Sequence, residues 1–212
     1  MPRGSLPYCS ELEDRLMPEN PQVFKAKVCM VGDAGVGKTS LVCRYVLDQF
    51  SDTYLSTLGT KVMKKQMSYN LPQDQKVDLM LTIWDIMGER ELLGVVKESY
   101  FNGTKGIVAV CDLTREDTIA ALATWLLAAT RVVGVVPTIV AANKLDLIPP
   151  RSINRLSEEL ESFAKEHSTS SILTSAKTGE NVEMAFRKLG MSVVGDIMRK
   201  KKQEESEAKP RA

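Results

Sequence analysis

Short apolar runs alternate along the chain with longer segments in which apolar residues recur at helical spacing. The apolar runs predict strands at about 24–31, 61–69, 77–84, 106–111, 136–142 and 171–174. The segments with helical spacing predict helices at about 38–48, 91–101, 116–132, 152–166 and 179–200. We expect the polar turn at residues 70–75 to join the second and third strands as the one antiparallel pair. Strands that alternate with helices form parallel sheets covered on both faces, so the pattern predicts an α/β fold.

The first predicted strand and the first predicted helix are joined by the sequence GDAGVGKT at residues 32–39. This sequence fits the phosphate-binding pattern G-x-x-x-x-G-K-S/T, in which a glycine-rich backbone points several N–H groups at one anion. Lys38 is expected to reach the β- and γ-phosphates, and the Thr39 hydroxyl to ligate Mg²⁺. A glycine-rich turn without a ligand is the alternative, but the strand–loop–helix context favours a bound nucleoside phosphate.

A tetrapeptide after the predicted strand at 136–142 indicates which base is bound. It reads NKLD and occupies residues 143–146. The Asp146 carboxylate can accept hydrogen bonds from both the N1–H and the exocyclic amine of guanine, a pair of donors that adenine lacks. An unpartnered buried carboxylate is costly, so this residue favours guanine.

Three further residues complete the expected base site. We expect Asn143 to hold the guanine edge and to tie its loop to the phosphate-binding loop. The aliphatic stem of Lys144 is expected to cover the flat face of the base. Ala176, in the segment 174–177, offers a backbone N–H to the guanine O6.

With these motifs in place, the chain resembles the Ras superfamily of small GTPases over about residues 23–200, most closely its Rab branch. The motifs that carry the resemblance fall in family order at residues 32–39, 56–59, 84–88, 143–146 and 175–177. The resemblance implies a three-layer P-loop GTPase fold, the G domain, with a six-stranded mostly parallel sheet and five flanking helices. It also implies GTP or GDP with Mg²⁺ as cofactors, and a molecular switch that hydrolyses GTP to GDP and phosphate.

The resemblance assigns roles to single residues. Thr57 falls on the threonine with which the family ligates Mg²⁺ and touches the γ-phosphate, and Phe50 on the aromatic residue that packs against guanine. Asp85 matches the residue that holds Mg²⁺ through water, and Gly88 the residue whose N–H senses the γ-phosphate. The expected metal ligands are thus Thr39, Thr57 and Asp85, and the expected catalytic residues are Lys38, Thr57, Gly88 and Glu89. The expected nucleotide-binding residues are Asp33, Ala34, Gly35, Val36, Gly37, Lys38, Thr39, Ser40, Phe50, Thr57, Gly88, Asn143, Lys144, Asp146, Ser175, Ala176 and Lys177.

The chain departs from the family pattern at residues 85–89, which read DIMGE where the family has DTAGQ. The family's glutamine orients the attacking water. Glu89 can accept a hydrogen bond from water, but it lacks the amide donor and brings negative charge toward the phosphate. We therefore expect hydrolysis that is slow, dependent on a partner or differently catalysed. Glu89 facing solvent is the alternative placement, and a non-hydrolysing guanine-nucleotide-binding scaffold is the alternative function.

Composition fits one domain with tails. The chain has 212 residues and a formal net charge of +1, which gives no sign of nucleic-acid binding. Residues 1–22 and 201–212 are predicted to be flexible tails around the G domain at 23–200. The four cysteines have no C-x-x-C spacing and are expected to be reduced.

The ends of the chain and the switch segments bear on its partners. The sequence has no signal peptide, no transmembrane-length run and no terminal prenylation cysteine, and Pro2 is incompatible with N-myristoylation. We therefore expect a cytoplasmic protein without an intrinsic membrane anchor, which reaches membranes only through a partner. The resemblance implies effector, exchange and activating proteins that bind residues 55–60 and 88–100.

Overall fold

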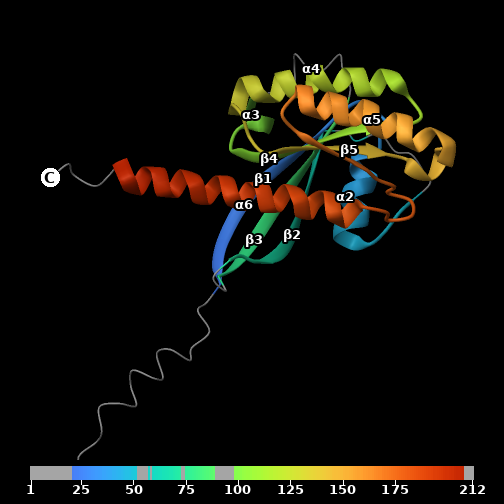
Figure 1. Ribbon diagram of the computed structural model, residues 1–212. Helices are drawn as coiled ribbons and strands as arrows, with labels where there is room; N and C mark the ends of the chain where they lie inside the picture. Colours follow the sequence, from blue (N-terminus) through green and yellow to red (C-terminus); the bar gives the residue numbers. More distant parts are fainter. Residues whose placement is uncertain (1–20, 52–56, 58, 73–74, 89–97, 208–212) are drawn as a thin grey trace, which may run out of the picture.

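The computed structural model describes residues 21–51, 57, 59–72, 75–88 and 98–207. One sheet contains six strands in the order β2-β3-β1-β4-β5-β6 (Figure 1). Only β2 and β3 pair antiparallel among the described strands, and the other neighbours are parallel. The predicted six-stranded, mostly parallel sheet is therefore confirmed. The strands are β1 Gln22–Val31, β2 Thr60–Asn70, β3 Lys76–Ile86, β4 Thr104–Asp112, β5 Thr138–Asn143 and β6 Ser170–Leu173.

Helices cover both faces of the sheet, which gives three layers (Figure 1). Helices α2 and α6 pack on one face, around a core that contains Leu41, Leu81 and Phe186. Helices α3, α4 and α5 pack on the other, around a core that contains Trp125 and Leu160. The helices are α2 Lys38–Leu47, α3 Glu98–Phe101, α4 Glu116–Val133, α5 Pro150–Glu166 and α6 Val182–Glu207, with a 3₁₀ turn η2 at Leu145–Leu147.

The largest difference from the predicted elements is at the C-terminal helix. Helix α6 starts three residues later than predicted and continues to Glu207, so the residues from 201 to 207 are helical. Lysine, glutamine and glutamate favour helix, and no proline interrupts the sequence before Pro210.

Two smaller differences concern β5 and α3. Strand β5 begins after Pro137, which has no N–H to donate to a neighbouring strand. Of the helix predicted at 91–101, only α3 lies within the described residues.

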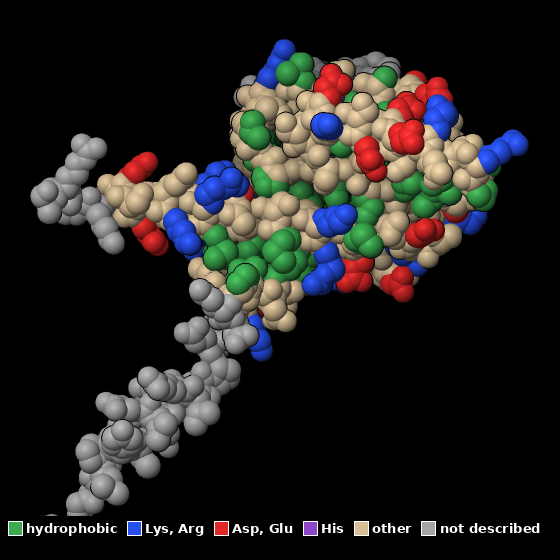
Figure 2. Space-filling view, viewed as in Figure 1, with side chains coloured by type: hydrophobic (Ala, Val, Ile, Leu, Met, Phe, Trp, Pro, Cys, Tyr) green, Lys and Arg blue, Asp and Glu red, His purple; other side chains and the backbone are tan. Residues whose placement is uncertain are grey.

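The carboxyl ends of the parallel strands bring the predicted motifs to one edge of the sheet. The strand order reverses between the neighbouring parallel strands β1 and β4, and such a switch point is where open α/β sheets bind ligands. On the face shown in Figure 2, basic and acidic side chains are interspersed, in keeping with the formal net charge of +1. Among the described residues, no helix combines the length and the apolar character needed to cross a membrane.

Candidate functional site

The loop between β1 and α2 has the geometry of an anion cradle. Gly35 and Gly37 have positive φ values of 74° and 99°. A Cβ at Gly37 would overlap Asn143 Nδ2, so the loop and the segment after β5 can approach this closely only because residue 37 is glycine. Gly37 is also the N-cap of α2 and has no side chain to accept hydrogen bonds from the first-turn N–H groups. Those donors face the cavity described below and suit a phosphate.

Lys38 is held inside this loop. Its Nζ donates to Gly32 O at 2.7 Å and to Asp33 O at 2.9 Å. Burial lowers the pKa of Lys38 to about 8, although the carboxylates of Asp85 and Asp33 favour its charged form. Gly88, which follows β3 and begins the expected partner segment at 88–100, lies against this lysine, because a Cβ there would overlap Lys38 Nζ. Lys38 and Gly88, both expected to contact the γ-phosphate, therefore lie side by side.

The three expected metal ligands converge beside Lys38. Thr39 Oγ1 donates to Asp85 Oδ2 and lies 3.0 Å from Thr57 Oγ1. Asp85 is 1% exposed, and its Oδ1 is buried without a hydrogen-bond partner among the described residues. Burial raises the pKa of Asp85, while the hydrogen bond from Thr39 and the charge of Lys38 oppose this rise. Two hydroxyls and a carboxylate with an unpartnered oxygen are ligands that Mg²⁺ accepts directly or through water, so these residues fit the ion.

The expected base-binding motif, at residues 143–146, forms the other end of the cavity. Asn143 Nδ2 donates to Val36 O at 3.0 Å, which is the expected tie to the phosphate-binding loop. The Oδ1 of the same side chain accepts from Ala176 N at 3.0 Å. Asp146 Oδ1 accepts from the Ser175 hydroxyl at 2.6 Å. The N–H expected to read the guanine O6 is thus already engaged by Asn143, and a base oxygen has to share or replace this acceptor.

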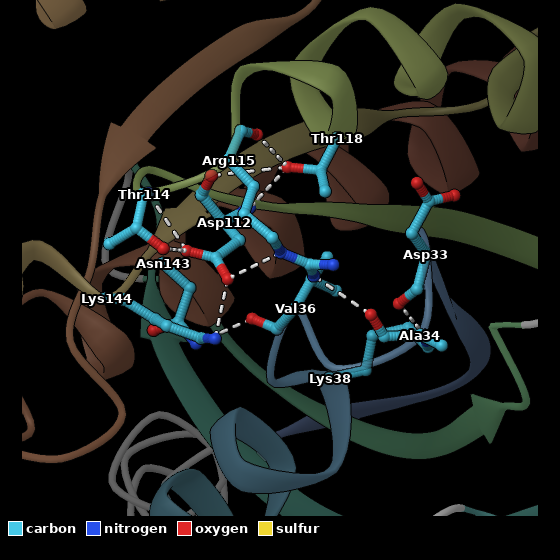
Figure 3. Close-up of polar contacts among 10 residues, drawn as sticks. All are labelled: Asp33, Ala34, Val36, Lys38, Asp112, Thr114, Arg115, Thr118, Asn143 and Lys144. Carbon is cyan, nitrogen blue, oxygen red and sulfur yellow. Dashed lines mark hydrogen bonds and ion pairs between the residues drawn. The ribbon is translucent and has the colours of Figure 1, made fainter.

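A buried carboxylate at the end of β4 joins the two ends of the cavity (Figure 3). Asp112 Oδ2 accepts from Lys144 Nζ at 2.6 Å and from Arg115 Nε at 3.1 Å. Arg115 Nη2 also donates to Ala34 O at 2.9 Å. Burial alone would raise the pKa of Asp112, but the hydrogen bonds from Lys144 and Thr114 hold it below its usual value. Asp112 thereby connects the lysine of the base motif to the phosphate-binding loop.

These ends enclose one cavity of about 1010 Å³. Most residues expected to bind nucleotide line it: Ala34, Gly35, Gly37, Lys38, Thr39, Ser40, Phe50, Thr57, Gly88, Asn143, Lys144, Asp146, Ala176 and Lys177. Val36 is fully buried outside the lining, and Ser175 acts on Asp146. The Asp33 carboxylate points away from Lys38 in Figure 3. It accepts a hydrogen bond from Trp125 Nε1 on α4 at 2.8 Å. Asp33 can therefore serve the phosphates through its backbone, while its side chain anchors the loop to α4.

Comparison with known proteins decides the family. A sequence model described as the Ras family matches residues 27–194. The chain belongs to the Ras family. It is 30% identical to Ras-related protein Rab-13 of Rattus norvegicus over 169 residues, 79% of each chain. It is 31% identical to Ras-related protein Rab-1D of Dictyostelium discoideum over 198 residues, 92% of each chain. The resemblance inferred from the motifs is confirmed, and membership implies a guanine-nucleotide-binding switch that uses Mg²⁺.

Some cavity residues of this Ras-family chain carry no motif. They are Cys43, Arg44, Asp48, Gln49, Ser51, Lys61 and Leu147. Helix α2 and the segment after it supply five of them, and the periodicity of an amphipathic helix gives no sign that its polar face meets a ligand. Glu89 lies outside the described residues, as do most residues of the expected partner segments at 55–60 and 88–100.

Proposed function

We propose that this Ras-family protein is a switch that binds GTP and GDP with Mg²⁺, hydrolyses GTP slowly and acts in signalling or trafficking-type regulation. One observation carries the proposal: a single cavity joins a carboxylate-bearing base end at Asp146 to a cation and metal-ligand end at Lys38 and Thr39. A guanosine nucleotide has complementary groups at its two ends. The Rab relatives support the trafficking-type role.

Base selection rests on Asp146. An ionised carboxylate offers about four lone-pair sites, so the hydrogen bond from Ser175 leaves acceptors for the N1–H and the amine of guanine. The buried hydrogen bonds of Asn143 to Val36 and Ala176 hold the part of the site next to Asp146 in place before a base binds. Adenine would leave the Asp146 carboxylate without these donors, and this loss favours guanine.

Phosphate chemistry rests on the other end. The Thr39 and Thr57 hydroxyls and the open oxygen of Asp85 would hold Mg²⁺. When bound, Mg²⁺ supplies charge that neutralises the β- and γ-phosphate oxygens. Lys38 donates to two backbone carbonyls here and would turn its donors to the phosphates. Its ammonium group and the loop N–H groups stabilise charge on the transferring phosphoryl group whether or not the water is well aligned.

We propose that hydrolysis is slow because Glu89 replaces the water-orienting glutamine. Single-turnover cleavage of GTP at saturating Mg²⁺ tests this with the wild type, Glu89→Gln and Glu89→Ala. We expect slow but measurable cleavage by the wild type, and equal or faster cleavage by Glu89→Gln. A Glu89→Ala rate close to wild type places Glu89 toward solvent, and a slower rate means that the carboxylate holds the water.

Two outcomes separate the alternatives. A Glu89→Gln rate well below the wild type would show that the carboxylate is itself catalytic and would contradict the slow-switch account. GTP binding without cleavage by any of the three forms would favour the non-hydrolysing scaffold.

We propose that activating, exchange and effector proteins bind residues 55–60 and 88–100. An activating protein that supplies an arginine could raise the rate of GTP hydrolysis by roughly 10³–10⁵.

A further inference from the structure

The side chain of Arg44 forms hydrogen bonds with the loop that follows β6. It lies on α2 and lines the cavity, and its side chain is 20% exposed. Its Nε donates to Ala176 O at 2.9 Å, and its Nη2 donates to Lys177 O at 2.8 Å. A planar guanidinium can hold two successive carbonyls in this way because its donors form a rigid fork. Arg44 therefore fixes the two peptide units on either side of Lys177 Cα, the first of which carries the Ala176 carbonyl.

The same guanidinium fixes the end of α2. Its Nη1 lies 2.9 Å from Asp48 Oδ1 and 3.3 Å from Asp48 O. Asp48 is the C-cap of α2 and has a positive φ of 52°. Its backbone N–H donates a hydrogen bond to Arg44 O at 3.0 Å. Two residues later the chain reaches Phe50, which also lines the cavity. Arg44 thus joins the helix end that leads to Phe50 to the loop that carries the Ala176 N–H.

Ala176 is held from both sides as a result. Asn143 Oδ1 accepts from its N–H at 3.0 Å, and Arg44 donates to its carbonyl. We propose that Arg44 is a positioning residue that sets the preference for guanine by holding the Ala176 N–H at the O6 of the base. This inference rests on the proposed function. It assigns Arg44 a role in base recognition that is separate from the carboxylate contacts of Asp146.

Nucleotides changed at one base atom test the inference. We would measure the Kd of GDP, inosine diphosphate and 6-thioguanosine diphosphate at fixed Mg²⁺ by displacement of a fluorescent GDP analogue. Inosine diphosphate keeps the O6 and loses the amine, whereas the thio compound keeps both N–H donors and replaces the O6 by sulfur, a weak acceptor. The proteins are wild type, Arg44→Ala, Arg44→Lys and the control Arg155→Ala. Arg155 is 63% exposed and pairs only with Glu116 and Glu159 among the described residues.

The expected result is selective for O6. Arg44→Ala should weaken GDP and inosine diphosphate by about tenfold, the effect of one misplaced hydrogen bond, and the thio compound by less than about threefold. Arg44→Lys should fall between Arg44→Ala and wild type, because one ammonium cannot hold both carbonyls. Arg155→Ala should bind all three nucleotides as the wild type does. The factor by which Arg44→Ala weakens GDP, divided by the factor by which it weakens the thio compound, measures the coupling between residue 44 and the base atom at position 6. General loosening of the protein weakens both nucleotides equally and cancels in this ratio.

Several outcomes would overturn the inference. Equal weakening of all three nucleotides by Arg44→Ala would mean that Arg44 only supports the fold. No weakening would mean that the loop after β6 keeps its binding conformation without Arg44. If Arg44→Ala does not fold, as judged by thermal melting, the same comparison with Arg44→Lys decides. A wild type that does not distinguish GDP from ADP would instead contradict the proposed function, so the two failures are distinguishable.

Discussion

The base end and the phosphate end of the cavity differ in how completely their polar groups are paired. At the base end, Asn143 bonds to Val36 and Ala176, and Asp146 bonds to Ser175. At the phosphate end, Asp85 Oδ1 is buried without a hydrogen-bond partner within the described ranges, and Gly37 leaves the first turn of α2 uncapped. One end is organised by the protein itself, and the other has donors and acceptors that a ligand would complete.

This difference indicates which end can report the nucleotide state. The base end, whose polar groups are already hydrogen-bonded, should contact GDP and GTP in the same way, since both present the same base. A ligand shifts a conformational equilibrium only through contacts that differ between states, and here those contacts involve the γ-phosphate. Thr57 and Gly88 lie at the phosphate end, beside Thr39 and Lys38. Base affinity and switching should therefore respond to different substitutions.

The largest effect is expected at the base end, from Asp146→Asn. An amide donor would then face the position where xanthine presents a carbonyl, so preference should move from guanosine to xanthosine nucleotides. We expect the ratio of GDP affinity to xanthosine diphosphate affinity to fall by about 10²-fold or more. Competition between the two nucleotides for the purified variant measures this ratio. An unchanged preference for GDP would remove Asp146 from base recognition.

A pair of threonine variants tests the phosphate end. Thr39→Ala should weaken Mg²⁺ and both nucleotides by roughly 10- to 100-fold, because a direct metal ligand is lost in both states. Thr57→Ala should spare GDP and mainly weaken a non-hydrolysable GTP analogue, because in the proposed switch Thr57 acts only when a γ-phosphate is present. Mg²⁺ titrations with each nucleotide compare them. If Thr57→Ala weakened GDP and GTP alike, the proposed division between the two ends would be wrong.

A smaller effect is expected from Asp112→Asn, because Asp112 contacts Lys144 at the base end and, through Arg115, the phosphate-binding loop. We expect a loss of about 1–3 kcal/mol in the free energy of unfolding and equal weakening of GDP and GTP. The pKa of Asp112 is lowered in the folded state, so its stabilisation is present above the unfolded value of about 3.9 and is lost as the pH falls through the folded value.

Urea unfolding at several pH values checks this sign. The difference in stability between wild type and Asp112→Asn should be constant from about pH 7 to pH 5 and should shrink below about pH 4. A difference that persists unchanged at pH 3 would mean that the ionised carboxylate does not supply the stabilisation.

The strands, most helices and the contiguous motifs could be predicted because their signals are local. Most strands contain a run of apolar residues between polar breaks, and Lys38 and Asp146 lie in motifs that directly follow a strand. Arg44 and Arg115 were missed because their acceptors lie 132 and 81 residues away in the sequence. On a helix surface, as for Arg44, or just before a helix, as for Arg115, such residues look like solvated charges.

Asp33 shows a different limit of sequence reasoning. Its place in the phosphate-binding pattern suggested a ligand contact, but its carboxylate pairs with Trp125, 92 residues along the chain. The backbone of a motif follows from local sequence, whereas the direction of a side chain depends on what the fold places beside it. The same limit applies to Asp112, whose role requires β4 and β5 to end side by side.

The central claim is that one cavity reads guanine at one end and phosphate with Mg²⁺ at the other. Calorimetric titration of the wild type with GDP, GTP, ADP and ATP, each with and without Mg²⁺, tests it most directly. The account predicts guanine nucleotides bound at least about 10²-fold more tightly than adenine nucleotides, and weaker binding of both GDP and GTP when Mg²⁺ is removed. Equal affinity for GTP and ATP, or guanine binding indifferent to Mg²⁺, would contradict it.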